Sequence, residues 1–426
     1  MERESGDKSQ PGLRLRLSIL AAIVFSVPGA FLPGYSTHLE HGLHFSPLEV
    51  SICAATQGIA SLLASLFGQL ADRVLPIKVV ISLCAFGICV AILGLILSTA
   101  PVLVFAFTFL YWLLTIPTWV MVSALLFTLL KNPEKEFGPV RMVGTVGWMA
   151  AGWSLVPLFA LFPTLGQGTG AQFGVALVLA AILAIYAMTL PNQQPLHPPG
   201  RSFAPSAAIR LLWGKSFALY SLSVFGICIS QPFVVQGTPL LLRELGIGSE
   251  WLVPALTLSQ VTEALLALLL AGIILRMGLK GTMGMGLVAW CLSLTILSVS
   301  QTLTLALASL PLNGFVITLF LISGSIWINS RVPDDLRASV QTVIVTIQGM
   351  GMCLGHLLMG LMRQAMQLES AAEELRWCFL VGGVLNGMLA LLFWWGFDPA
   401  QKPANAPALD VDYSSPQTSS STSSAT

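Results

Sequence analysis

The chain has 426 residues, of which 55% are hydrophobic and only 9% are charged. A water-soluble fold needs far more polar side chains to cover its surface, so this composition excludes one and predicts an all-α membrane protein. The formal net charge of +1, without a basic cluster beyond the loops, gives no support for nucleic acid or another polyanion as a partner.

Apolar stretches of about twenty residues or more recur along the chain, which is the length that a helix needs to cross ~30 Å of hydrocarbon. The first stretch follows Arg14 and Arg16 as a signal peptide would, but no small-residue cleavage site precedes polar sequence, so we expect a helix there. The pattern predicts twelve transmembrane helices, at residues 18–37, 48–72, 78–99, 102–130, 138–162, 171–190, 217–242, 251–275, 282–301, 303–328, 338–362 and 376–397.

A polar, proline-rich segment separates the sixth and seventh predicted helices. We therefore expect an N-terminal six-helix bundle at 1–190, a cytoplasmic central loop at 191–216 and a C-terminal six-helix bundle at 217–397. A weak repeat, GQLADRVLPIK against GIILRMGLK, relates the two halves, as is typical of transporters. Residues 398–426, rich in Pro, Ala, Ser and Thr, predict a disordered cytoplasmic tail.

The basic residues predict the orientation in the membrane. If the amino terminus is cytoplasmic, all of the 20 Lys and Arg except Arg243, Arg363 and Arg376 fall on the cytoplasmic side. Lys and Arg in short loops favour that side, so we expect a multi-pass protein of the cell inner membrane with both termini in the cytoplasm.

One acidic residue differs from the other 18 of the 19, because Glu263 alone lies near the middle of a predicted span. A carboxylate at that depth is costly unless it is paired, hydrated or protonated, which makes Glu263 a candidate for coupling transport to protons. Gln260 lies one turn earlier on the same face. The alternative is a neutral or paired glutamate that holds two helices together.

Polar residues in two other spans are candidate solute ligands. Gln231 lies near mid-depth in the seventh span, and its amide suits hydroxyls or the edge of a base, although such amides also join helices. Arg141, Thr145 and Trp148 share one face of the fifth span. Hydropathy alone makes Arg141 a cytoplasmic anchor, whereas an earlier helix start would bring its guanidinium into a cavity, where it could pair with Glu263 while Trp148 stacks on a ring.

Gly68, Asp72 and Arg73 lie at the inner end of the second span, where glycine permits close helix approach and the acid can interact with a helix terminus. We predict a gating latch there, with loop capping as the alternative.

His356 is expected to be a hydrogen-bonded residue within the bundle. The seven cysteines lack metal-ligand spacing, and the histidines beside Glu40 indicate an external loop, so we expect no metal site.

The segment GQLADRVLPIK resembles the loop signature of the major facilitator superfamily, with Leu75 in place of the second glycine. A closer resemblance, to the nucleoside:proton symporter family, extends over essentially the whole chain. It is carried by FGPVRMVGTVGW (137–148), LSQVTEALL (258–266), LISGSIW (321–327) and RASVQ (337–341).

This resemblance implies a major facilitator fold of two pseudo-symmetric six-helix bundles and proton-coupled uptake of nucleosides by alternating access. It also implies which residues lie at or beside a central nucleoside and proton site: Arg141, Thr145, Trp148, Gln231, Gln260 and Glu263. The chain departs from the family in its tenth helix, where Thr318 occupies the place of an aspartate. Glu263 and Arg141 are thus the expected proton-coupling pair, and Thr318 is counted among the expected substrate-binding residues.

Two other functions stay open. The run EFGPVRMVGTVGW also resembles the fifth helix of the lactose permease, which keeps a proton-coupled sugar or glycoside transporter possible, and a sensor with a transporter fold would bind without flux. The sequence has no HExxH, no GxSxG and no pair of acids at membrane depth, so we expect no enzyme. The expected partners are a small solute, protons and lipid, the chain is expected to be a monomer, and the proton gradient replaces any cofactor.

Overall fold

The computed structural model describes residues 12–74, 76–130, 133–162, 164, 170–191, 214–332 and 337–401, and all regular structure in them is helical. The first half of the chain forms α1 (Leu13–Phe31), α2 (Tyr35–Thr37), η1 (His38–Gly42), α3 (Pro47–Val74), α4 (Ile77–Leu97), α5 (Pro101–Leu129), α6 (Pro133–Trp153), α7 (Leu155–Leu161) and α8 (Ala171–Met188). The second half forms α10 (Lys215–Glu244), α11 (Ser249–Leu256), α12 (Leu258–Val299), α13 (Leu303–Phe315), η3 (Val316–Ile322), α14 (Ser323–Arg331), α15 (Arg337–Met366) and α16 (Ala371–Gly396).

Within the described residues, ten helical segments are long and apolar enough to cross a membrane. The segment Ser249–Val299 has 51 residues and contains a non-helical residue, Gly278, with φ of 70°. Its two parts correspond to the eighth and ninth predicted spans, and glycine is suited to this break because it has no Cβ to oppose a positive φ. The helical multi-pass prediction is confirmed, while the number of twelve crossings stays a prediction.

Three predicted spans are interrupted rather than continuous. The first turns at Leu32 to Gly34 before it resumes as α2 and η1. The fifth is divided at Ser154 into α6 and α7, and the eighth is divided at Thr257 into α11 and α12. The last two breaks lie side by side, because the indole Nε1 of Trp153 donates a hydrogen bond of 3.2 Å to the Thr257 hydroxyl.

The apolar side chains of each half pack mainly among themselves. One large core cluster lies within α10 to α16, and two others lie within α1 to α8. A smaller cluster of Leu155, Phe159 and Val253 joins the halves at the paired helix breaks. Many large apolar side chains point outward instead, including Leu275 at 86% and Trp395 at 84% exposed, as expected of a surface that faces lipid.

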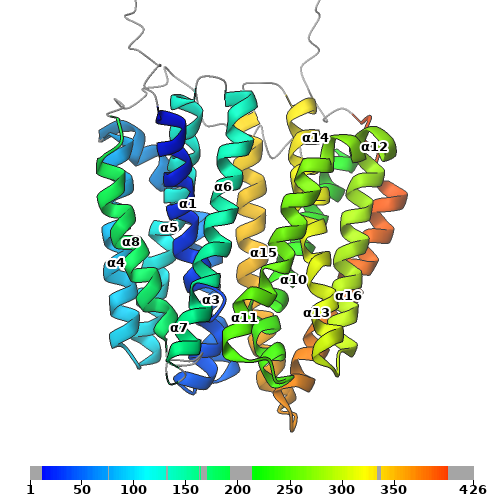
Figure 1. Cartoon of the computed structure of the whole chain (residues 1–426). Coiled ribbons are helices and arrows are strands. Elements are labelled where there is room, and N and C mark those ends of the chain that lie inside the picture. Colours follow the sequence, from blue (N-terminus) through cyan, green and yellow to red (C-terminus); the bar gives the residue numbers. More distant parts are fainter. Residues whose placement is uncertain are drawn as a thin grey trace, which may run out of the picture.

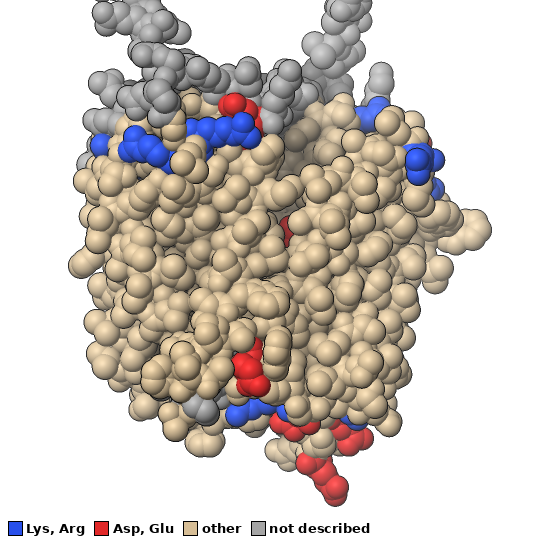
Figure 2. All heavy atoms as spheres, viewed as in Figure 1, with Lys and Arg blue, Asp and Glu red and all other residues tan. Residues whose placement is uncertain are grey.

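The two ends of the bundle differ in charge and in packing. We call the end at which α1 begins the upper end, and the end that carries η1, α7 and α11 the lower end (Figure 1). Lys and Arg side chains gather along the upper rim, whereas most acidic side chains visible on this face lie toward the lower end (Figure 2). The same face is hollowed between the halves toward the upper end, and an acidic side chain is visible at mid-height in the groove (Figure 2).

Glycine permits close helix packing both between the two halves and within the second half. At Gly58 of α3, an added Cβ would lie 2.6 Å from the backbone nitrogen of Cys353 in α15. At Gly355 of α15, it would lie 2.1 Å from the carbonyl oxygen of Ile229 in α10. At Gly351, one turn earlier, an added Cβ would lie 2.9 Å from the carbonyl oxygen of Phe225 in α10, so both glycines serve helix packing, a common use of this spacing in membrane helices.

Candidate functional site

Arg141 and Glu263 are the charged pair that the sequence predicts at the central site. Helix α6 begins at Pro133 and not at residue 138, so Arg141 lies more than one turn inside the helix instead of at its start. Its guanidinium carbon lies 3.8 Å from the centre of the Phe25 ring, a cation–π contact with α1. Its charge also interacts with that of Glu263 on α12, in the other half. The earlier helix start thus favours the cavity position of Arg141 over the anchor.

The backbone around Glu263 is held by the tenth predicted span. The hydroxyl of Thr318, in the π-helical segment η3, donates a hydrogen bond of 3.2 Å to the carbonyl oxygen of Glu263. Gly314, one turn earlier, lets this segment approach, since a Cβ there would lie 2.6 Å from the Glu263 backbone nitrogen. Thr318 therefore lies beside Glu263 and contacts its backbone, while its expected role in substrate binding stays a prediction. Single turns of π-helix often mark functional sites.

The remaining predicted ligands are half-buried on α6, α10 and α12. On α6, Gly144 and Gly147 face α1, and the Trp148 backbone packs against Gly29, where a Cβ would lie 2.5 Å from its carbonyl oxygen. Close packing of α6 on α1 thus fixes the height of Trp148. Four predicted ligands are all partly exposed: Thr145, Trp148, Gln231 and Gln260. The Gln260 amide oxygen accepts a hydrogen bond of 3.1 Å from the neighbouring Ser259 hydroxyl.

The predicted gate at Gly68, Asp72 and Arg73 lies on α3, but the side chains of these residues are outside the described part of the chain. It stays a prediction. Among the described residues, no group of three or more His, Cys, Asp or Glu is placed to hold a metal ion.

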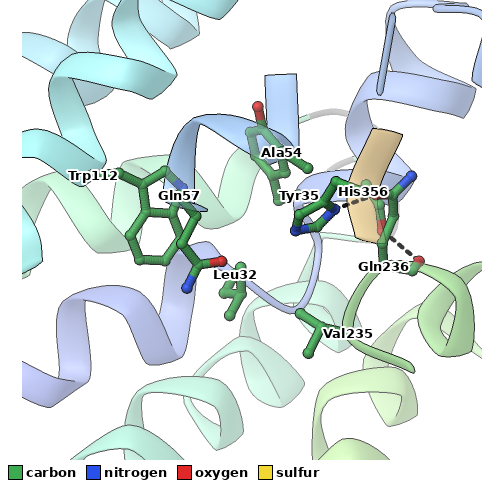
Figure 3. Close-up of a pocket in the computed structure, with 9 residues that line it drawn as sticks. Leu32, Tyr35, Ala54, Gln57, Trp112, Val235, Gln236 and His356 are labelled. Carbon is green, nitrogen blue, oxygen red and sulfur yellow. Dashed lines mark hydrogen bonds between the residues drawn. The ribbon is translucent and has the colours of Figure 1, made fainter. Parts of the chain in front are cut away.

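Below the charged pair, toward the lower end, a small pocket lies between the halves (Figure 3). Neutral polar and aromatic side chains dominate its wall. The lining residues are Leu32, Tyr35, Ser36, Ala54, Gln57, Trp112, Val235, Gln236 and His356. His356 is hydrogen-bonded within the bundle, as predicted, because its Nδ1 lies 2.9 Å from the Gln236 side-chain oxygen. The sequence could not predict that His356 lines a pocket, because the helices that form the pocket are distant from one another along the chain.

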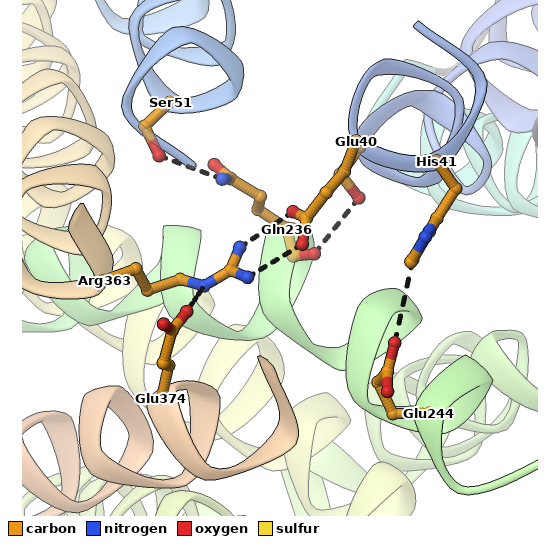
Figure 4. Close-up of polar contacts among 8 residues, drawn as sticks. Glu40, His41, Ser51, Gln236, Glu244, Arg363 and Glu374 are labelled. Atoms are coloured by element: carbon orange, nitrogen blue, oxygen red, sulfur yellow. Dashed lines mark hydrogen bonds and ion pairs between the residues drawn. The ribbon is translucent and has the colours of Figure 1, made fainter. Parts of the chain in front are cut away.

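A second set of polar contacts closes the lower end (Figure 4). Arg363 of α15 is buried and donates two hydrogen bonds, of 2.8 and 2.7 Å, to the two carboxylate oxygens of Glu40 in η1. Its Nε donates a third, of 3.2 Å, to Glu374 at the start of α16. Bidentate pairing of this kind is strong and directional. We call Glu40, Arg363 and Glu374 the lower latch. Glu40 belongs to the first half of the chain, whereas Arg363 and Glu374 belong to the second.

Gln236 of α10 adds neutral contacts to the same closure. Its side-chain nitrogen donates a hydrogen bond of 2.9 Å to the hydroxyl of Ser51 in α3, and its backbone oxygen accepts one of 3.1 Å from Ser36. His41 and Glu244 form a further pair at 3.9 Å. These contacts all join the two halves at the lower end, opposite the hollow in Figure 2.

Known proteins share this fold and are similar in sequence along most of the chain. The crystal structure of the nucleoside transporter NupG superposes with a TM-score of 0.78 at 22% identity, covering 90% of this chain and 98% of that chain. The xanthosine permease of Escherichia coli (strain K12) is 25% identical over 413 residues, which cover 90% of this chain and 96% of that protein. The nucleoside permease NupG of the same organism is 24% identical over 374 residues, which cover 82% and 87%.

The sequence profile described as nucleoside H+ symporter matches residues 12–402, which is most of the chain. This match confirms the resemblance on which the expected fold was based, and the structural similarity confirms a fold of the major facilitator type. It also confirms a membrane transporter and not an enzyme. The chain belongs to the nucleoside H+ symporter family.

Proposed function

We propose that this protein carries nucleosides across the membrane together with protons, by alternating access between the two halves. The observation that carries the proposal is the position of Glu263, an ionisable carboxyl group that interacts with the Arg141 guanidinium across the interface between the halves. Names of relatives such as xanthosine permease and nucleoside permease support the class of solute.

The charges of this pair explain why proton and solute would move together. Ionised Glu263 neutralises Arg141 in the empty transporter, so the halves can close on the pair at modest cost. Protonation of Glu263 alone would leave Arg141 as an unpaired charge, which is expensive to remove from water. A bound nucleoside supplies polar atoms to the free guanidinium and removes that penalty. Closure is therefore favoured with both proton and solute bound, or with neither.

In the binding step, each half supplies different groups. Arg141 and Trp148 would contact the solute from α6, the first by hydrogen bonds and the second by stacking on a ring. Gln231 and Gln260 would supply amide donors and acceptors from α10 and α12. Thr318 would position the Glu263 backbone rather than carry a proton, because its hydroxyl donates to that carbonyl group.

We infer twelve crossings, with α12 contributing two that meet at Gly278. The bundles are 1–190 and 217–397, joined by the central loop 191–216, and the chain is a monomer.

Lys and Arg along the upper rim support a cytoplasmic upper end, with both termini and the tail 398–426 on that side of the inner membrane (Figure 2). The arrangement described here is then open to the cytoplasm, and Gly68, Asp72 and Arg73 would close that end in the alternate state. No cofactor is needed beyond the proton gradient.

Uptake by the purified protein in proteoliposomes tests this function. With an inward proton gradient, labelled uridine, adenosine or xanthosine should accumulate above the level reached in protein-free liposomes, and dissipating the gradient should abolish the accumulation. Unlabelled nucleosides should compete, whereas xylose and lactose should not. Accumulation of a sugar alone would support the glycoside alternative, and nucleoside binding without flux would support a sensor.

A further inference from the structure

The ring of Phe25 in α1 is in direct contact with the charge of Arg141. The guanidinium carbon lies 3.8 Å from the centre of this ring, which is buried. Glu263 acts on the same guanidinium from farther away, because the two side chains form no hydrogen bond or close ion pair in the part of the chain that the structure describes. The aromatic ring is therefore the closer of these two contacts of the cation.

Close packing of α1 on α6 fixes the position of the ring relative to the guanidinium. At Gly144, three residues after the arginine, an added Cβ would lie 2.6 Å from Cδ2 of Phe25, so the glycine leaves room for the ring. At Gly147, an added Cβ would lie 2.3 Å from the carbonyl oxygen of Ala22. The Ser26 hydroxyl donates a hydrogen bond of 3.0 Å to the Gly147 carbonyl oxygen. These contacts hold the two helices in one register beside the cation.

A third helix of the same half also holds the ring. Trp119 of α5 stacks on Phe25, with ring centres 5.7 Å apart and planes inclined by 20°. The helices α1, α5 and α6 all belong to the first half, whereas Glu263 lies on α12 in the second half. If the halves move relative to each other, the contact between Phe25 and Arg141 lies within one moving body, while the interaction with Glu263 spans two. Phe25 can therefore stay with the cation when Glu263 does not.

We propose that Phe25 is a positioning residue for nucleoside binding, which holds the Arg141 guanidinium in place when Glu263 is protonated. The inference rests on the proposed function. Protonation removes the negative charge of Glu263, and the electron-rich face of the Phe25 ring still stabilises the cation. A guanidinium without this contact would have more conformations available, and fixing one of them would cost the solute affinity. Phe25 thus pre-organises the donors that the solute needs.

Fluorination of the Phe25 ring tests this role with little change in the shape of the side chain. Each fluorine withdraws electron density from the ring face and weakens its attraction for a cation. Phenylalanine with one, two or three ring fluorines can be introduced at residue 25 by nonsense suppression. The series is made in the unmodified protein and in Glu263→Gln, which imitates the protonated carboxyl group. The dissociation constant of labelled uridine and the Tm are measured in detergent for each protein.

Phe31 provides the matched control on the same helix. It is fully buried, and its ring stacks on those of Tyr35 and Tyr111, with centres 5.3 and 4.0 Å apart. The same fluorinated residues at this position therefore report the effect of fluorine on aromatic packing in α1. They should leave the Kd for uridine unchanged, whatever their effect on the Tm.

At residue 25, the logarithm of the Kd for uridine should rise by a similar increment with each fluorine. The total for three fluorines should be about three- to thirtyfold, the range of a cation–π contact. The increment should be at least as large in Glu263→Gln, because the negative charge that shares the cation with Phe25 is then absent. The Tm should not follow the number of fluorines.

Three outcomes would overturn the inference. If the Kd does not depend on the number of fluorines, or depends on it equally at residue 31, Phe25 only fills space. If the dependence vanishes in Glu263→Gln, or if that variant binds no uridine, Phe25 does not hold Arg141 for the solute once the carboxyl group is neutral. A protein that binds no nucleoside in any form would overturn the proposed function and this inference with it, whereas binding that ignores fluorination overturns this inference alone.

Discussion

The guanidinium of Arg141 has two interactions at once, because it lies over the Phe25 ring and its charge interacts with that of Glu263. A lysine ammonium cannot reproduce this, since it is a point charge without a planar face or a fork of donors. The identity of the cation therefore matters at this residue as much as its charge.

Arg141→Lys is expected to weaken nucleoside binding by about 10- to 100-fold, the range of hydrogen bonds to a charged group. Equilibrium binding of labelled nucleoside to the detergent-solubilised protein measures this loss. The matched control is Arg276→Lys, which changes an exposed arginine of α12 and should leave binding unchanged. Unaltered affinity in Arg141→Lys would exclude Arg141 from the binding site.

At the scale of the elements, close helix contacts determine where the site residues lie. Gly355 brings α15 against α10, the helix that carries both Gln231 and Gln236, and the Cβ of any larger residue would overlap the Ile229 carbonyl oxygen. Gly272 on α12 is the opposite case, because an added Cβ would meet nothing within 4 Å. The two glycines therefore offer a matched pair of substitutions.

Gly355→Ala is expected to destabilise the fold by about 1–3 kcal/mol, as other overpacked contacts do. Gly272→Ala should leave stability equal or slightly higher, because alanine favours a helix by about 1 kcal/mol over glycine. Thermal unfolding in detergent, followed by tryptophan fluorescence, compares the two. A Gly355→Ala protein with an unchanged Tm would show that α10 and α15 can separate at no cost.

Elements that depend on local sequence could be predicted, and those that depend on contacts could not. Twenty-residue apolar stretches locate the helices because the requirement of the bilayer is local. At the break of the eighth span, Thr257 contacts Trp153 of the other half, a pairing that hydropathy does not register. Glu263 was found because a buried acid is unusual in any membrane helix, whereas His356 and the latch arginine Arg363 needed three-dimensional proximity, since Arg363 and Glu40 are 323 residues apart.

For the whole molecule, the lower latch explains how one end can be held closed and later opened. Arg363 contacts a carboxylate on each side of the interface, so separation of the halves would leave it paired with Glu374 of its own half. Only Glu40 would then lose its partner, and it can be hydrated at the open end. A buried arginine with a single partner would be left unpaired by the same movement, at much greater cost.

Glu40→Gln is therefore expected to favour opening at the lower end. A cysteine introduced at Ser36, a buried residue of α2, reports the opening in a background without the seven native cysteines. Its reaction with a membrane-impermeant maleimide should be about tenfold faster in Glu40→Gln, which corresponds to about 1.4 kcal/mol. Glu374→Gln should have a smaller effect, because the bond across the interface remains.

The control for this experiment is Glu373→Gln, which neutralises an exposed glutamate in the same first turn of α16. It should leave the labelling rate unchanged. Equal rates in the Glu40→Gln protein and in this control would mean that the latch does not hold the lower end.

Proton movement driven by nucleoside tests the central claim most directly. Adding nucleoside outside proteoliposomes, without an imposed gradient, should acidify their lumen, as read by an enclosed pH-sensitive dye. Glu263→Gln should abolish this signal while exchange of labelled for unlabelled nucleoside continues, and Glu250→Gln, at the lower end in α11, should keep both activities. Acidification that persists undiminished in Glu263→Gln would contradict the assignment of the transported proton to Glu263.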